Sequence, residues 1–112
     1  MKAFVMSFFG FAVISSSAWA GNIVCKGGIL SNKIDRFSTL TPSGPDVLTG
    51  YKANHIVGGF TFIAAKNSAG RMDLSIRSDS KNDEVIGEAD NADSLTIPVG
   101  KGYKASVFCG EE

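Results

Sequence analysis

A chain of 112 residues that carries eleven basic and eleven acidic side chains has no net charge at neutral pH. This balance provides no basic surface of the kind that binds nucleic acid or an anionic membrane, so we expect neither as a partner. The length is enough for one domain and too short for two.

The first twenty residues combine three features of a secretory signal peptide. Lys2 supplies the early positive charge, residues 3–14 form an uncharged and mainly apolar run, and Ala18-Trp19-Ala20 places small residues where signal peptidase needs them. The run is shorter than the roughly 20 apolar residues of a transmembrane helix, which disfavours a membrane anchor. We therefore expect cleavage after Ala20 and export of residues 21–112 to the periplasm or the secreted fraction of a bacterium.

The exported part, residues 21–112, favours a single all-β domain. Glycine, serine, asparagine and aspartate are scattered through it, and no long stretch of helix formers occurs at helical spacing. Short apolar alternations recur instead, interrupted roughly every 8–12 residues by turn-forming residues. This rhythm predicts a small antiparallel β-sandwich or barrel built from hairpins.

The first part of the domain holds the weaker strand predictions and two glycine doublets. Alternation favours strands at residues 22–26, 34–40, 47–51 and 55–57, with a turn-rich loop at 41–46. Gly27-Gly28 and Gly58-Gly59 lack the strand, loop and helix context of a phosphate-binding loop. We expect turns or bulges at both doublets.

The clearest unit is a hairpin of residues 60–65 and 71–77 around a turn at 66–70. If Ala65 lies opposite Arg71, three apolar pairs share one face of the hairpin, and the other face is largely polar. The buried pairs in this register are Phe60 with Ile76, Phe62 with Leu74, and Ala64 with Met72. Thr61 and Ser75 then lie on the solvent side.

A polar loop at 78–84 and a weaker strand at 85–89 precede a second hairpin, formed by residues 95–99 and 103–109. Gly100 and Gly102 supply the positive φ that its tight turn needs. The expected inward pairs are Val99 with Tyr103, Ile97 with Ala105, and Leu95 with Val107. Pro98 cannot donate to a β-ladder, so it is expected on an exposed edge or where the pairing of the strands lapses.

The two cysteines, Cys25 and Cys109, are expected to form a disulfide that joins the first and last strands. Disulfides persist in the compartments to which exported proteins are sent, and a domain of this size gains from a covalent link. A metal site or a catalytic pair is the alternative. It is disfavoured because the chain has no CxxC spacing and only one histidine.

Residues for catalysis or metal binding are few. His55 is the only imidazole, and no nucleophile, second base or pair of carboxylates accompanies it in a recognisable pattern. The acidic stretch at 79–93 raises the possibility of calcium, but Lys81 occupies the place of a ligand in the EF-hand order. We expect a solvated acidic loop, no metal site and no cofactor.

The sequence therefore favours a non-enzymatic exported protein that binds another protein or a component of the cell envelope. Four aromatic residues are expected in the core, although one or two of them could face outward and anchor a partner: Phe37, Tyr51, Tyr103 and Phe108. The alternative function is inhibition of a hydrolase, because small disulfide-linked β-domains present rigid loops well. The loop at 41–46 and the turn that contains Asn67 would then be the inserted loops.

Overall fold

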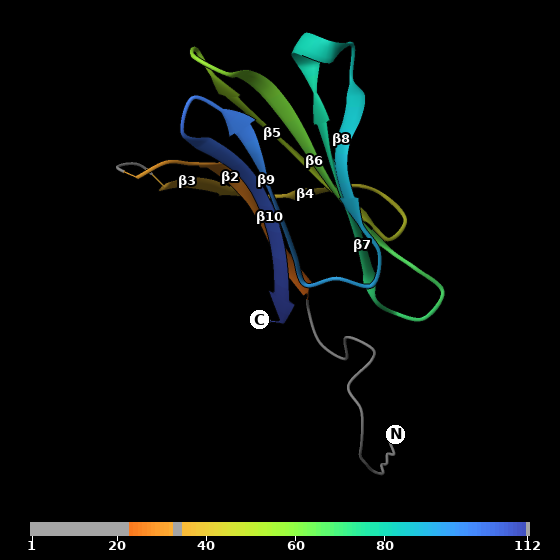
Figure 1. Cartoon of the computed structure of the whole chain (residues 1–112). Helices are drawn as coiled ribbons and strands as arrows, with labels where there is room; N and C mark the ends of the chain where they lie inside the picture. The colour runs from red at the N-terminus through yellow and green to blue at the C-terminus, as the bar shows by residue number, and fades with distance from the viewer. Residues whose placement is uncertain (1–22, 33–34, 112) are drawn as a thin grey trace.

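The computed structural model describes residues 23–32 and 35–111, which form two antiparallel β-sheets packed face to face as a sandwich (Figure 1). The predicted signal peptide and its cleavage site lie outside the described residues. The first sheet has the spatial order β3 (Asp35–Thr39), β2 (Ile23–Leu30), β10 (Tyr103–Glu111) and β9 (Ser94–Gly100). The second sheet has the order β4 (Thr41–Gly44), β5 (Val47–Asn54), β6 (Gly58–Lys66), β7 (Met72–Ser78) and β8 (Glu84–Ala89).

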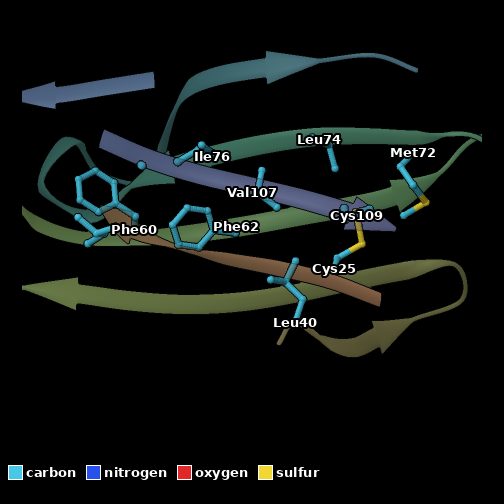
Figure 2. Close-up of a cluster of buried hydrophobic side chains, with 12 residues drawn as sticks. Cys25, Leu40, Phe60, Phe62, Met72, Leu74, Ile76, Val107 and Cys109 are labelled. Atoms are coloured by element: carbon cyan, nitrogen blue, oxygen red, sulfur yellow. A yellow bond between two sulfur atoms is a disulfide. The ribbon is translucent and has the colours of Figure 1, made fainter. Parts of the chain in front are cut away.

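The core lies between the sheets and receives side chains from both (Figure 2). Strands β6 and β7 contribute alternate residues, as expected for strands that bury one face. The buried apolar residues are Cys25, Ile29, Leu40, Phe60, Phe62, Ala64, Met72, Leu74, Ile76, Ala105, Val107 and Cys109. The all-β sandwich predicted from the apolar alternation is confirmed.

The predicted disulfide between Cys25 and Cys109 is also confirmed. The two residues are direct partners on the neighbouring strands β2 and β10, with their α-carbons 4.0 Å apart. The Cys25 carbonyl accepts from the Leu40 N–H, and the Cys109 N–H donates to the Asp93 carbonyl, both at 2.8 Å. Both of these hydrogen bonds are therefore made to other residues, and not between the two cysteines. Cys25 and Cys109 form a non-hydrogen-bonded antiparallel pair, the type in which the two α-carbons lie closer together.

The β6–β7 hairpin has the predicted inward face but a different register. Phe62 lies opposite Ile76 and Ala64 lies opposite Leu74, so the predicted partners are wrong by two residues. The reason is the turn. The Asn67 N–H donates to the Arg71 carbonyl, and the Asn67 side-chain oxygen accepts from the Ala69 and Arg71 N–H groups. A shift by an even number of residues leaves the same side chains facing inward.

The β9–β10 hairpin confirms two of its three predicted pairs. Leu95 lies opposite Val107 and Ile97 opposite Ala105, but Tyr103 lies opposite Gly100 and not Val99. The turn residues Lys101 and Gly102 both have positive φ, as a tight two-residue hairpin turn requires. A bulge between Tyr103 and Lys104 then restores the register.

Pro98 lies on β9, an edge strand of the first sheet, as predicted. Hydrogen-bonded and non-hydrogen-bonded pairs alternate along an antiparallel ladder. The Cys109 N–H donates to the Asp93 carbonyl, so these two residues form a hydrogen-bonded pair. The alternation along the ladder then makes Lys104 and Pro98 a non-hydrogen-bonded pair, in which the nitrogen of Pro98 faces the free edge. The missing N–H therefore removes no bond to β10, and the proline makes the edge a poorer template for another strand.

Three of the local predictions are wrong. Residues 55–57 form a turn and not a strand, because the Asn54 side-chain oxygen accepts from the Ile56 and Val57 N–H groups. Most of the predicted loop at 41–46 is strand β4, which pairs with β5. Gly27-Gly28 lies inside β2 between two paired neighbours. A β-carbon on Gly28 would overlap the Arg36 carbonyl oxygen, so close strand approach explains that glycine.

Candidate functional site

A basic cavity of about 300 Å³ lies at one margin of the sandwich, where β3 of the first sheet approaches β5 of the second. Its cationic residues are Arg36 from β3 and Lys52 from β5. Arg36 is the cross-strand partner of the buried Ile29, and Lys52 is the partner of the buried Phe60. Because direct partners share a face, both cationic residues occupy inward-facing positions of their sheets.

Lys52 is held in place by a hydrogen bond across the two sheets. Its Nζ donates to Oγ of Ser38 on β3, at 2.8 Å. Ser38 is the partner of Gly27, which faces the core, so this hydroxyl also lies on the inward side of its strand. The ammonium group is therefore positioned by a contact with the opposite sheet.

Asn54 is a neutral polar residue of the cavity lining. Its Oδ1 accepts from the backbone N–H groups of Ile56 and Val57, at 2.7 and 3.2 Å. This assignment of the oxygen leaves the NH₂ group as the free end of the side chain. Asn54 lines the cavity together with His55 and Tyr103.

Among the described residues that line this cavity, none carries a carboxylate. Among the side chains that the structure describes, those of residues 23–32 and 36–111, Arg71 forms an ion pair with Asp93, and no ion pair to Arg36 or Lys52 is found. The cavity thus combines two positive charges with neutral donors. Such a lining favours a negatively charged ligand.

His55, the one histidine, lies exposed in the turn between β5 and β6 and lines this cavity. The structure brings it together with Arg36 and Lys52, neither of which was singled out from the sequence. The described part of the chain contains no cluster of three or more histidine, cysteine, aspartate or glutamate side chains that could hold a metal ion.

The acidic stretch at 79–93 is divided among the 3₁₀ turn η1 (Asp79–Lys81), strand β8 and the loop that follows it. Asp79 accepts a hydrogen bond of 2.6 Å from the Tyr51 hydroxyl. Asp93 forms an ion pair of 3.7 Å with Arg71. These two carboxylates therefore interact with side chains of β5 and of the β6–β7 turn.

The turn that contains Asn67 is held together by its own side chain. Besides the two backbone groups that its oxygen binds, Asn67 donates from Nδ2 to Asp73 at 3.0 Å and to Asn91 at 2.6 Å. This side chain has its donors and acceptor occupied within the domain. It is therefore a poor contact residue for an inserted inhibitory loop.

Two of the four aromatic residues predicted for the core are exposed. Tyr51 is 56% exposed and Phe108 is 38% exposed, while Phe37 and Tyr103 are half-buried. Phe108 alternates with the buried Val107 and Cys109, so it lies on the outer face of its sheet. There it packs edge-on against Phe37, with the ring centroids 5.3 Å apart.

A second opening, of about 610 Å³, separates β8 from β9, the edge strands on the other side of the sandwich. Its lining is mainly apolar and includes Phe60, Ile86 and Ile97. Lys81 and Glu84 place one charge of each sign in the same lining. This groove therefore has no net charge that would select a ligand of one sign.

Comparison with protein-family models, with curated proteins and with solved structures found no match. The described residues include no helix that is both long and apolar enough to cross a membrane.

Proposed function

We propose that the protein is a small exported binding protein without enzymatic activity, and that its ligand enters the basic cavity with a negatively charged group. The observation that carries this proposal is the placement of Arg36 and Lys52, which line one cavity from opposite sheets with no carboxylate among its described lining residues. Two positive charges in one site repel each other when it is empty. An anion bound between them is attracted by both.

Two features support export. The first twenty residues have the charge, the apolar run and the Ala18-Trp19-Ala20 sequence of a cleavable signal. The Cys25–Cys109 disulfide fits an oxidising compartment such as the periplasm or the extracellular medium. Intact-mass analysis of exported protein tests this part of the proposal. The expected mass is that of residues 21–112, and a mass that includes Trp19 would contradict cleavage after Ala20.

The two loops that were candidates for insertion into a hydrolase favour a binding role over inhibition, because both are engaged within the domain. The segment 41–46 is largely paired as β4, and the Asn67 side chain is used within its own turn. A protein or an envelope component that carries an anionic group is therefore favoured as the partner over a hydrolase that receives an inserted loop.

The test is a titration of the oxidised domain, residues 21–112, with a panel of small anions at low ionic strength. Salt must be kept low because screening weakens contacts between exposed charges. Inorganic phosphate, sulfate and acetate are suitable first probes. We expect saturable changes in the amide NMR signals around Arg36, Lys52 and Asn54. If no member of the panel binds there, the proposal is wrong.

A further inference from the structure

We propose that the basic cavity selects a phosphoryl group, either as free phosphate or as a phosphate monoester, over a simple carboxylate. This inference rests on the proposed function and specifies the chemistry of its ligand. The shared feature of both sources is a doubly charged group with several oxygen acceptors. A carboxylate offers one charge and two oxygens.

The charge of the cavity matches a dianion. Arg36 and Lys52 both line it, and none of the carboxylates whose side chains the structure describes forms an ion pair with either residue. One carboxylate would leave the site with an excess positive charge, whereas a phosphate dianion balances both cations. The guanidinium of Arg36 can donate two parallel hydrogen bonds to adjacent phosphate oxygens, and the ammonium of Lys52 supplies a point charge.

The neutral residues of the cavity lining carry further hydrogen-bond donors. The Asn54 amide is oriented by its contacts with Ile56 and Val57, so that its NH₂ group remains for a ligand. Tyr103 and His55, whose side chains also carry polar hydrogens, line the same cavity. A group with three or four oxygens uses such a set of donors more fully than a carboxylate does.

The size of the cavity also suits a small phosphate ester. About 300 Å³ lies at the lower end of the range for small-molecule sites. Ile29 supplies an apolar surface beside the charged groups, against which the carbon atoms of an ester can pack. Because the two cationic residues come from β3 and β5, the bound group would also connect the two sheets.

The experiment compares three probes at equal ionic strength by calorimetry or NMR titration: inorganic phosphate, glycerol 3-phosphate and acetate. We expect each phosphate probe to bind at least about tenfold more tightly than acetate. Tighter binding of glycerol 3-phosphate than of phosphate would assign an ester source, such as an envelope lipid or polymer. Equal or weaker binding of the ester would assign free phosphate.

Variants then locate the site. Lys52→Gln and Arg36→Lys should each weaken phosphate binding by about tenfold or more, because one removes a charge and the other removes the planar fork. Lys66→Gln is the matched control, since Lys66 is exposed at the end of β6 far from the β5–β6 turn. It removes the same charge outside the cavity and should leave the affinity unchanged. Circular dichroism confirms that each variant is folded.

The outcomes separate this inference from the proposed function. If acetate binds at the cavity as tightly as phosphate, the phosphoryl assignment is wrong and the binding of an anion remains. If none of the anions binds, both are wrong. If Lys66→Gln weakens phosphate binding as much as Lys52→Gln does, the effect comes from net charge and the assignment to the cavity fails.

Discussion

Gly27 of β2 faces the ring of Phe62 of β6 across the core, so closely that a β-carbon on the glycine would lie 2.6 Å from Cγ of the ring. The two sheets approach here because one of them presents no side chain. Phe62 is 1% exposed and lies among the buried residues of both sheets (Figure 2). Glycine is therefore needed at position 27 because it leaves room for the Phe62 ring between the sheets. Its backbone conformation is not the reason.

Gly27→Ala is expected to destabilise the domain by about 1–3 kcal/mol, the usual cost of forcing extra volume into a packed core. Gly110→Ala on β10 is the matched control, because a β-carbon there meets no atom within 4 Å. Alanine also lowers the entropy of the unfolded chain, so the control variant should be neutral or slightly more stable. Urea unfolding measures both variants, and an equal loss of stability in the two would contradict the predicted overlap.

Neighbouring substitutions on β7 test which face is buried. Leu74 is 1% exposed and Ser75 points to the outer side of the sheet. Leu74→Ala should lower the free energy of unfolding by about 2–5 kcal/mol through lost burial and a residual cavity. Ser75→Ala should change it by no more than about 0.5 kcal/mol. Similar losses for the two variants in denaturant melts would show that the strand does not bury the assigned face.

The faces of the strands could be predicted from the sequence, but their register could not. Alternation along 60–65 and 71–77 identifies the inward side chains without knowledge of the turn. The register depends on which residues close the turn, and here the Asn67 side chain binds the backbone of Ala69 and Arg71. An asparagine in a glycine-containing turn is compatible with turns of several types and lengths. The sequence alone therefore does not predict which backbone groups the Asn67 side chain binds.

The basic cavity was missed for two reasons. The strand predicted at 47–51 ends one residue before Lys52, because the boundary of a strand is the least certain part of such a prediction. Arg36 occupies an inward position on an edge strand. A charged residue at such a position can be assigned to the inward face only when the strand that pairs with it is known. That β3 and β5 approach each other across two sheets is a property of the topology, which alternation along the chain does not contain.

Tyr51 should ionise at a higher pH than an ordinary tyrosine. The hydrogen bond from its hydroxyl to Asp79 is the largest cause of the raised pKa, followed by desolvation and by the negative charges of Asp79 and Asp83. Asp79→Asn removes the charge, so it should shift the pKa of Tyr51 back toward 10.0. An absorbance titration in a Tyr103→Phe background isolates Tyr51. No downward shift in the Asn variant would contradict this explanation.

The sign of the corresponding stability effect follows from linkage. The folded state holds the Tyr51 proton more tightly than the unfolded chain does, so this contribution is fully present below the unfolded pKa near 10. It decreases as the pH rises through the higher folded pKa. The free energy of unfolding should therefore decrease at alkaline pH. This decrease should be smaller in the Tyr51→Phe variant, which has no phenol at position 51 to ionise. Unfolding melts at a series of pH values above about 9 measure this loss.

The disulfide between Cys25 and Cys109 closes a loop with a sequence separation of 84 residues between the first and last strands of the described sandwich. Such a closure restricts the unfolded chain, and the loop-entropy treatment assigns it about 4.5 kcal/mol. That value is comparable with the whole net stability of a small domain, which is about 5–15 kcal/mol. The cross-link therefore contributes a large share of the stability, even though β2 and β10 also pair along their length.

Cys25→Ser combined with Cys109→Ser should accordingly lower the melting temperature sharply or abolish folding. A serine pair also places two hydroxyl groups at positions that are 0% and 7% exposed, which adds a desolvation cost. Cys25→Ala with Cys109→Ala is the control that removes the bond without adding hydroxyl groups, and it isolates the loss of the cross-link. Thermal melts of the oxidised protein, the reduced protein and both variants measure these contributions. If reduction leaves the melting temperature of the native sequence unchanged, the disulfide does not stabilise the fold, and pairing of β2 with β10 suffices.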